Sequence, residues 1–129
     1  KPVNRKPKVA PGTPLTPEQL IAVGKEAYDL YECYNCHKIG GKGATKKRGP
    51  KLDNIGNLVK PEDMKRKIFD PQIFVAEGFE KEHKKGLMPD NYKEIMEDEE
   101  LDALVAYLMT LRNTSVDTPK PVFHDAGQH

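Results

Sequence analysis

The sequence contains no tryptophan, only two cysteines and no long hydrophobic run. A helix that spans a membrane needs about 20 apolar residues, whereas apolar stretches such as residues 104–109 are far shorter. Two cysteines are also too few for a small protein that many disulfides hold together. These absences exclude a membrane-spanning segment and a disulfide-dense miniprotein.

Excess charge of one sign is also lacking. Lys and Arg number 21 and Asp and Glu number 20, so the formal net charge is +1. A domain dedicated to nucleic acid is usually strongly basic, and this balance therefore argues against nucleic acid as a partner. With 129 residues, 36% of them hydrophobic and 32% charged, the chain has the size of one soluble domain with a modest core.

Both ends of the chain read as extensions of that domain. Residues 1–15 hold four prolines and four basic residues without an acid, so they neither propagate a helix nor supply a core. Residues 113–129 lack helical periodicity. We therefore predict a compact domain over 16–112, an N-terminal arm over 1–15 and a C-terminal tail over 113–129. A start at Lys1 without an initiator Met favours processing after a cleaved signal peptide.

Helical signals dominate the predicted domain. Residues 16–31 open with a capping box at Thr16 and a proline at the first helical position, and apolar residues then recur at helical spacing. A second strong helix is predicted from Asp98 to Leu111, and shorter ones over 61–69 and 90–97. Because no segment shows sustained period-two alternation, the predicted fold class is all-α.

Gly24 interrupts the apolar stripe of the first predicted helix. Glycine inside a helix costs about 1 kcal/mol relative to alanine. We therefore expect another backbone or a large ring to need the space beside Gly24, with Tyr107 of the last helix as the expected occupant and Tyr28 next to it.

The segment Cys33-Tyr34-Asn35-Cys36-His37 carries the chemistry. C-x-x-C-H is the attachment motif of c-type haem: the thiols of Cys33 and Cys36 form thioethers with the porphyrin, and the adjacent His37 is presented to the iron. A structural zinc site needs about four Cys or His ligands, a thioredoxin-like pair needs a βαβ context, and a disulfide across two residues adds little stability. We therefore predict one covalent haem c and its iron.

The sixth iron ligand has several candidates. Met88 lies between Gly86 and Pro89 in a non-helical run that would hold its thioether outward, and it is the predicted ligand together with His37. His83 is the strongest rival. The other candidates are Met64, Met96, Met109, His124 and His129. Ligation by His and Met raises the reduction potential relative to two nitrogen ligands, and a closed coordination sphere suits an electron carrier.

From Thr16 to Arg112 the chain resembles the class I cytochromes c, which are small all-α monohaem electron-transfer proteins. The shared features, in family order, are Gly24 and Tyr28, the C-x-x-C-H motif, Gly49-Pro50-Lys51-Leu52, Met88-Pro89, and the last helix with Tyr107. The resemblance implies three to five helices around one covalently bound haem, with extended terminal arms. It also implies that the Pro50 carbonyl accepts a hydrogen bond from His37 Nδ1 and that Leu52 belongs to the haem-binding set. The indole that binds a haem propionate in many relatives has no counterpart here.

Charge is distributed unevenly along the chain. Residues 38–67 contain ten basic and three acidic residues, whereas residues 90–102 contain seven acidic residues and one lysine. In the family that the chain resembles, the partly exposed haem edge lies between the first segment and the Met88 loop. A basic rim there predicts redox protein partners with an acidic docking surface and an association that weakens with salt.

The leading hypothesis is single-electron transfer between redox proteins, with the iron cycling between Fe(III) and Fe(II) and without enzymatic activity. The expected location is the periplasm or another extracytoplasmic compartment, where bacteria attach haem c. One alternative is a haem c subunit of a larger oxidoreductase, or a self-associated chain, assembled through the terminal arms. The other is a peroxidase-type or gas-binding haem protein, which requires that Met88 does not coordinate iron and that His83 acts as the distal acid–base residue.

Overall fold

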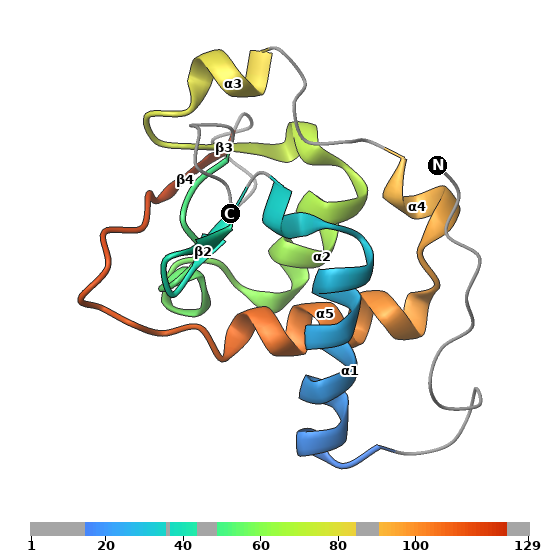
Figure 1. Ribbon diagram of the computed structural model, residues 1–129. Coiled ribbons are helices and arrows are strands. Elements are labelled where there is room, and N and C mark those ends of the chain that lie inside the picture. The colour runs from blue at the N-terminus through green and yellow to red at the C-terminus, as the bar shows by residue number, and fades with distance from the viewer. Residues whose placement is uncertain (1–14, 36, 44–48, 85–90, 124–129) are drawn as a thin grey trace.

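A computed structural model describes residues 15–35, 37–43, 49–84 and 91–123 (Figure 1). Over these residues the chain forms the helices α1 (Pro17–Leu30), α2 (Pro61–Phe69), α3 (Glu80–Lys84), α4 (Tyr92–Ile95) and α5 (Asp98–Met109). Between the helices lie the 3-10 turns η1 (Cys33–Asn35), η2 (Ile55–Asn57) and η3 (Pro71–Ile73) and the strands β1 (Lys38–Ile39), β2 (Lys42–Gly43) and β3 (Phe74–Ala76), and strand β4 (Pro121–Phe123) follows α5. The prediction of a mostly helical fold is confirmed, and the strands are only two or three residues long.

Helix α1 begins as the sequence predicts. The Gln19 amide donates to Thr16 Oγ1 at 3.1 Å, and the Thr16 amide donates to Gln19 Oε1 at 3.0 Å. This reciprocal pair satisfies two of the amides that a helix start leaves without partners. Pro17 fills the first helical position, where its lack of an N–H costs nothing.

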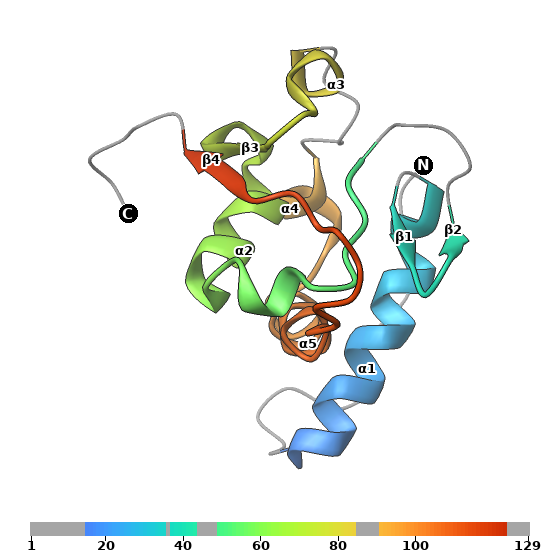
Figure 2. The same ribbon diagram turned by 90° about the vertical axis from the view of Figure 1, so that its left-hand side faces the viewer.

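Helices α1 and α5 cross and form the most extensive helix–helix contact in the described chain (Figures 1 and 2). Gly24 lies at the crossing, where a Cβ would overlap the carbonyl oxygen of Ala103 and lie 2.8 Å from Cβ of Tyr107. The rings of Tyr28 and Tyr107 meet edge to face beside it, with centroids 5.9 Å apart. The expectation that a backbone and Tyr107 need the space at Gly24 is confirmed.

The start of α5 is tied to the end of α1 by a buried carboxylate. Glu100 is 1% exposed, and its Oε1 accepts hydrogen bonds from Tyr31 Oη at 2.6 Å and from the Glu97 amide at 3.2 Å. Tyr31 Oη also lies 3.1 Å from the carbonyl oxygen of Ile95, at the end of α4. The carboxylate thus caps α5 and fixes α1 and α4 against it.

The hydrophobic core lies between α1, α2 and α5. Leu104, Val105 and Leu108 of α5 are buried there with Met64 and Ile68 of α2. Both helices begin with acidic residues in their first turn, as the helix dipole favours. The predicted helix over 61–69 is confirmed, and the segment predicted to form one or two turns over 90–97 contains the single turn α4.

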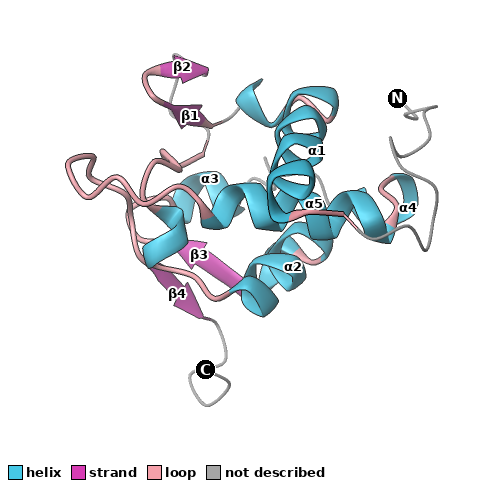
Figure 3. Cartoon of the chain, turned by 90° about the horizontal axis from the view of Figure 1, so that it is seen from below, coloured by secondary structure: helices cyan, strands magenta, loops and turns pink. Residues whose placement is uncertain are grey.

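Residues 113–123, here called the C-terminal strap, run back along the domain after α5 (Figure 1). The Asn113 amide donates to the Asp53 carbonyl at 2.9 Å, and the Asn54 amide donates to Thr118 Oγ1 at 3.1 Å. The strap ends in β4, which pairs antiparallel with β3 (Figure 3). This part of the predicted tail is therefore packed on the domain. The N-terminal arm lies outside the described residues, apart from Leu15 at its end.

Candidate functional site

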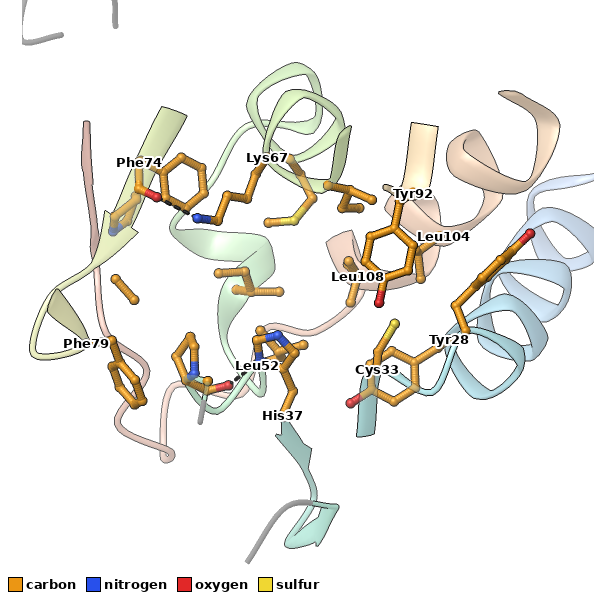
Figure 4. Close-up of a pocket in the computed structure, with 18 of the residues that line it drawn as sticks. Tyr28, Cys33, His37, Leu52, Lys67, Phe74, Phe79, Tyr92, Leu104 and Leu108 are labelled. Atoms are coloured by element: carbon orange, nitrogen blue, oxygen red, sulfur yellow. Dashed lines mark hydrogen bonds between the residues drawn. The ribbon is translucent and has the colours of Figure 1, made fainter. Parts of the chain in front are cut away.

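A cavity of about 440 Å³ lies beside the core, and residues from nearly every element line it (Figure 4). Most of the lining is apolar, including Leu52, Ile55, Phe74, Leu104 and Leu108. Its size and its apolar character are typical of a site for a small molecule or cofactor. The polar side chains that reach it are therefore the ones that could direct its chemistry.

His37 enters this cavity with one ring nitrogen already engaged (Figure 4). Its Nδ1–H donates to the Pro50 carbonyl oxygen over 2.8 Å, which is the hydrogen bond that the resemblance implies. This bond selects the tautomer with a lone pair on Nε2, the form that binds a metal. Burial of the ring lowers the pKa of His37, which favours the same neutral form.

Short backbone contacts hold His37 and Pro50 together. The Leu52 amide donates to the Lys38 carbonyl at 2.9 Å, and Lys38 forms a parallel bridge with Lys51. The β1–β2 hairpin brings Gly43 back at a φ of 126°, where a Cβ would overlap the His37 carbonyl oxygen. Residues 44–48 lie outside the described residues, and the segments before and after them are held around His37 by these contacts.

Cys33 lines the same cavity from η1 (Figure 4). Glu32, with a φ of 57°, turns the chain sharply between α1 and η1, and such a left-handed conformation is uncommon outside glycine. The His37 amide donates to the Cys33 carbonyl at 3.1 Å, so the thiol and the imidazole leave one compact turn on the same side. Cys36 lies outside the described residues.

Three tyrosines line the cavity: Tyr28, Tyr31 and Tyr92. Tyr31 and Tyr92 meet edge to face with centroids 6.1 Å apart. The buried Oη of Tyr28 has no hydrogen-bond partner among the described residues, and burial raises the pKa of this phenol. A buried hydroxyl without a partner is costly, so the site has one polar atom that the described residues do not satisfy.

The structure separates the candidate sixth ligands into three groups. Met64, Met96 and His83 line the cavity. Met109 packs partly buried against the core and is not among the lining residues. Met88, the predicted ligand, lies outside the described residues, as do His124 and His129.

Lys67 is a charged residue of the site that was not predicted from the sequence. It counts among the ten basic residues of 38–67, yet its ammonium group turns inward and lines the cavity (Figure 4). Its Nζ donates to the carbonyl oxygens of Pro71 and Phe74, both at 2.6 Å. Burial lowers the pKa of Lys67 to about 8. The only signal in the sequence was its position one residue before the apolar pair Ile68-Phe69 in a short helix.

The residues present fit a haem. A porphyrin needs a large apolar space, an imidazole with a free Nε2 and, for covalent attachment, a thiol beside it, and His37, Cys33 and the apolar lining meet in one cavity. Among the described residues, no group of three or more His, Cys, Asp or Glu could hold a metal ion by itself.

Comparison with known proteins agrees with this assignment. The family model described as Cytochrome c matches residues 21–112, well over half of the chain. No curated protein and no solved structure matches the chain significantly. The match ends at Arg112, directly before the C-terminal strap.

Proposed function

The chain belongs to the cytochrome c family, whose general activity is haem-based electron transfer, and we propose that it passes single electrons between redox proteins. The observation that carries this proposal is the His37 ring, which the Pro50 carbonyl holds in an apolar cavity beside Cys33. In this proposal the protein is not an enzyme, because the site presents a metal ligand and an apolar wall rather than an acid–base pair.

The proposed roles follow the arrangement of the cavity. Cys33 and Cys36 attach one haem covalently, His37 binds its iron through Nε2, and Met88 provides the sixth ligand. Leu52, which is 7% exposed, packs against the porphyrin in this proposal. When bound, the haem supplies a one-electron couple between Fe(III) and Fe(II).

The protein's own contribution is to hold the ligand still and to exclude water. The Pro50 carbonyl fixes the orientation of the His37 ring and makes its Nε2 a better donor. Apolar side chains such as Leu104 and Leu108 lower the dielectric around the site. Neither contribution moves a proton or opens a coordination position for a substrate. Both suit a haem that only gains and loses an electron.

Replacement of Met88 by alanine tests the proposed sixth ligand. We expect the variant to retain covalent haem, to lose the weak far-red absorption band of ferric iron bound to methionine sulfur, and to bind carbon monoxide when reduced. We also expect a lower reduction potential, because a nitrogen or water ligand replaces the thioether. Optical spectroscopy and a redox titration measure both effects.

Met64→Leu is the matched control, since Met64 is a buried methionine of the same cavity that we assign to packing. It should keep the far-red band and resist carbon monoxide. A Met88→Ala protein with an unchanged spectrum and potential would show that another residue ligates the iron.

One observation favours a second candidate function. His83 lies on the cavity wall, where the alternative of a peroxidase-type or gas-binding haem protein needs a distal acid–base residue. The two functions differ in the unaltered protein: the carrier does not bind carbon monoxide when reduced, whereas the alternative binds it at once. His83→Ala then separates the roles, since only the alternative loses activity with peroxide.

Redox partners are part of the family's activity, and we propose that their docking surface is acidic. Lys42 and Lys51 are exposed on the segments that flank His37, and Tyr34 beside Cys33 is 40% exposed. The opposite end of the basic segment is partly neutralised, because Lys65 pairs with Asp102 of α5. The basic surface that remains for docking therefore lies near the haem-attachment motif.

The double variant Lys42→Glu, Lys51→Glu tests this surface. We expect its second-order rate of electron transfer with an acidic partner protein to fall about tenfold at low salt, and its dependence on ionic strength to become weak, because electrostatic steering accelerates association. Stopped-flow mixing over a series of salt concentrations measures both. Lys25→Glu, an exposed change on α1, is the control. A flat salt profile of the unaltered protein contradicts the proposal.

We further propose a periplasmic or other extracytoplasmic location, because bacteria attach haem c there. No helix among the described residues is long and apolar enough to cross a membrane. Assembly into a larger oxidoreductase, or self-association through the terminal arms, is the alternative to a diffusible carrier, and sedimentation at low concentration distinguishes the two.

A further inference from the structure

Lys67 is the one lysine among the described residues that lines the apolar cavity. It leaves α2 near the end of the helix, and its Nζ reaches the carbonyl oxygens of Pro71 and Phe74 at the corner between η3 and β3. The ammonium also lies 4.9 Å from the centroid of the Phe74 ring, a cation–π distance. Three separate interactions thus hold one positive charge at the wall of the site (Figure 4).

A charge placed there acts on the site with little screening. The side chains around it are mostly apolar, and charges in such surroundings interact more strongly than charges in water. Lys67 and His37, the side chain that we assign as the iron ligand, line the same cavity.

We propose that Lys67 sets the reduction potential of the haem and takes up a proton when the haem is reduced. This inference rests on the proposed function. Reduction adds one negative charge to the site, so a nearby ammonium stabilises the reduced protein and the reduced protein in turn holds that proton more tightly. In balanced form, one electron arrives from the redox partner, one proton from solvent binds the neutral Lys67 amine, and no other bond forms or breaks.

Lys67 changes its protonation state within the pH range that a redox titration can cover. Burial lowers its pKa to about 8, and Asp70 at the end of α2 acts in the opposite direction. Other titratable side chains also line this cavity. In chain order they are Tyr28 of α1, Tyr31 and Glu32 directly after α1, Cys33 of η1, His37, His83 of α3 and Tyr92 of α4. The neighbours Pro71, Ile73, Phe74 and Val75 on η3 and β3 add no titratable group.

The protonation of Lys67 determines how the reduction potential changes with pH. Below the pKa of Lys67 in the oxidised protein, the amine is charged in both oxidation states and the potential is constant. As the pH rises through that pKa, reduction begins to take up a proton, and the potential falls. Above the pKa in the reduced protein, the amine is neutral in both states and the potential is constant again at a lower value.

The test is a redox titration of the haem-loaded protein and its variants between pH 6 and pH 10, combined with proton uptake on reduction in weakly buffered solution. We expect the potential of the unaltered protein to fall across a window around pH 8. Lys67→Met keeps the aliphatic stem without the charge, and at pH 7 it should lower the equilibrium constant for reduction about tenfold, equal to about 59 mV for one electron. Its potential should not depend on pH in that window.

Lys67→Arg distinguishes this role from a structural one. Arginine stays charged at every pH of the titration and can still donate to the two carbonyl oxygens, so its potential should remain high and lose the fall near pH 8. A lysine that only supports the α2–β3 corner predicts unchanged potentials in both variants, with a lower melting temperature in Lys67→Met alone. His83→Asn should retain the fall near pH 8.

The outcomes separate this inference from the proposed function. A protein without covalent haem or without a reversible one-electron couple contradicts the proposed function. A reversible couple that is independent of pH, or one whose dependence on pH survives in Lys67→Met or disappears in His83→Asn, overturns the role of Lys67 and leaves electron transfer intact.

Discussion

A chain in which alanine replaces both Cys33 and Cys36, and which carries no haem, will lack a cooperative unfolding transition. The reason is the apolar cavity of about 440 Å³ beside the core, whose lining has no packing partner without haem. A closed cavity in a core costs about 24 cal/mol for each Å³, so about 10 kcal/mol is the upper limit for a space of this size. Domains of this kind are stable by only about 5–15 kcal/mol in total.

Circular dichroism during heating measures this effect. We expect the haem-free double variant to lose ellipticity gradually, whereas the haem-loaded protein melts in one sharp transition. Tyr34→Ala is the control, because it alters the same motif at a side chain that is 40% exposed and leaves both thiols in place. A sharp, native-like melt of the haem-free variant would refute the prediction.

Gly24→Ala is the second change with a large expected effect. Its Cβ would overlap the carbonyl oxygen of Ala103, and a backbone atom cannot move aside as the end of a side chain can. Helices α1 and α5 would have to separate, and overpacking costs about 1–3 kcal/mol and occasionally more. The added Cβ would also lie 2.8 Å from Cβ of Tyr107, so the Tyr28–Tyr107 ring contact would be lost as well.

The sign of this effect distinguishes packing from helix propensity. Propensity alone predicts that Gly24→Ala stabilises the helix by about 1 kcal/mol, opposite to the expected loss. Chemical denaturation of the haem-loaded protein measures the free energy of unfolding. Lys25→Ala, at the next and exposed position, should change it by about 0.5 kcal/mol or less. A stabilised Gly24→Ala protein would mean that α1 and α5 do not cross at Gly24.

The features predicted correctly from the sequence are those that neighbouring residues determine. The capping box at Thr16 and the acidic start of α5 are local signals, and both helices begin where they indicate. Gly24 was informative because glycine is unfavourable inside a helix. Its presence in an apolar stripe therefore indicates that another group packs too closely for a Cβ. The haem-binding role of Cys33 and His37 stays a prediction, but the structure places both side chains in one cavity.

The features that were missed depend on contacts between distant parts of the chain. Strand β3 has only three residues, too few for an alternating pattern, and it exists because β4 returns to it from the far end of the chain. Helix α3, with five residues, likewise shows no periodicity. The sequence of the tail predicted over 113–129 does not indicate this pairing, because Thr118 and the β4 backbone have their partners in distant parts of the chain.

Lys67 was misread for a related reason. In a segment with ten basic residues, each lysine is assigned to the surface unless another signal says otherwise. Its inward direction is determined by two carbonyl oxygens, those of Pro71 and Phe74, which accept hydrogen bonds from its Nζ. Sequence patterns report the polarity of a side chain but do not show where backbone groups need a donor.

The C-terminal strap has a consequence for the order in which the molecule assembles. Pro119 and Pro121 form part of the cavity wall, and β4 pairs with a strand that lies far away in sequence. Closing so long a loop is entropically unfavourable, so contacts of this separation form late. Residues 119–121 therefore complete the wall late in folding, and until they dock the cavity stays open on that side. A cofactor enters most easily during this interval, and the strap then encloses it.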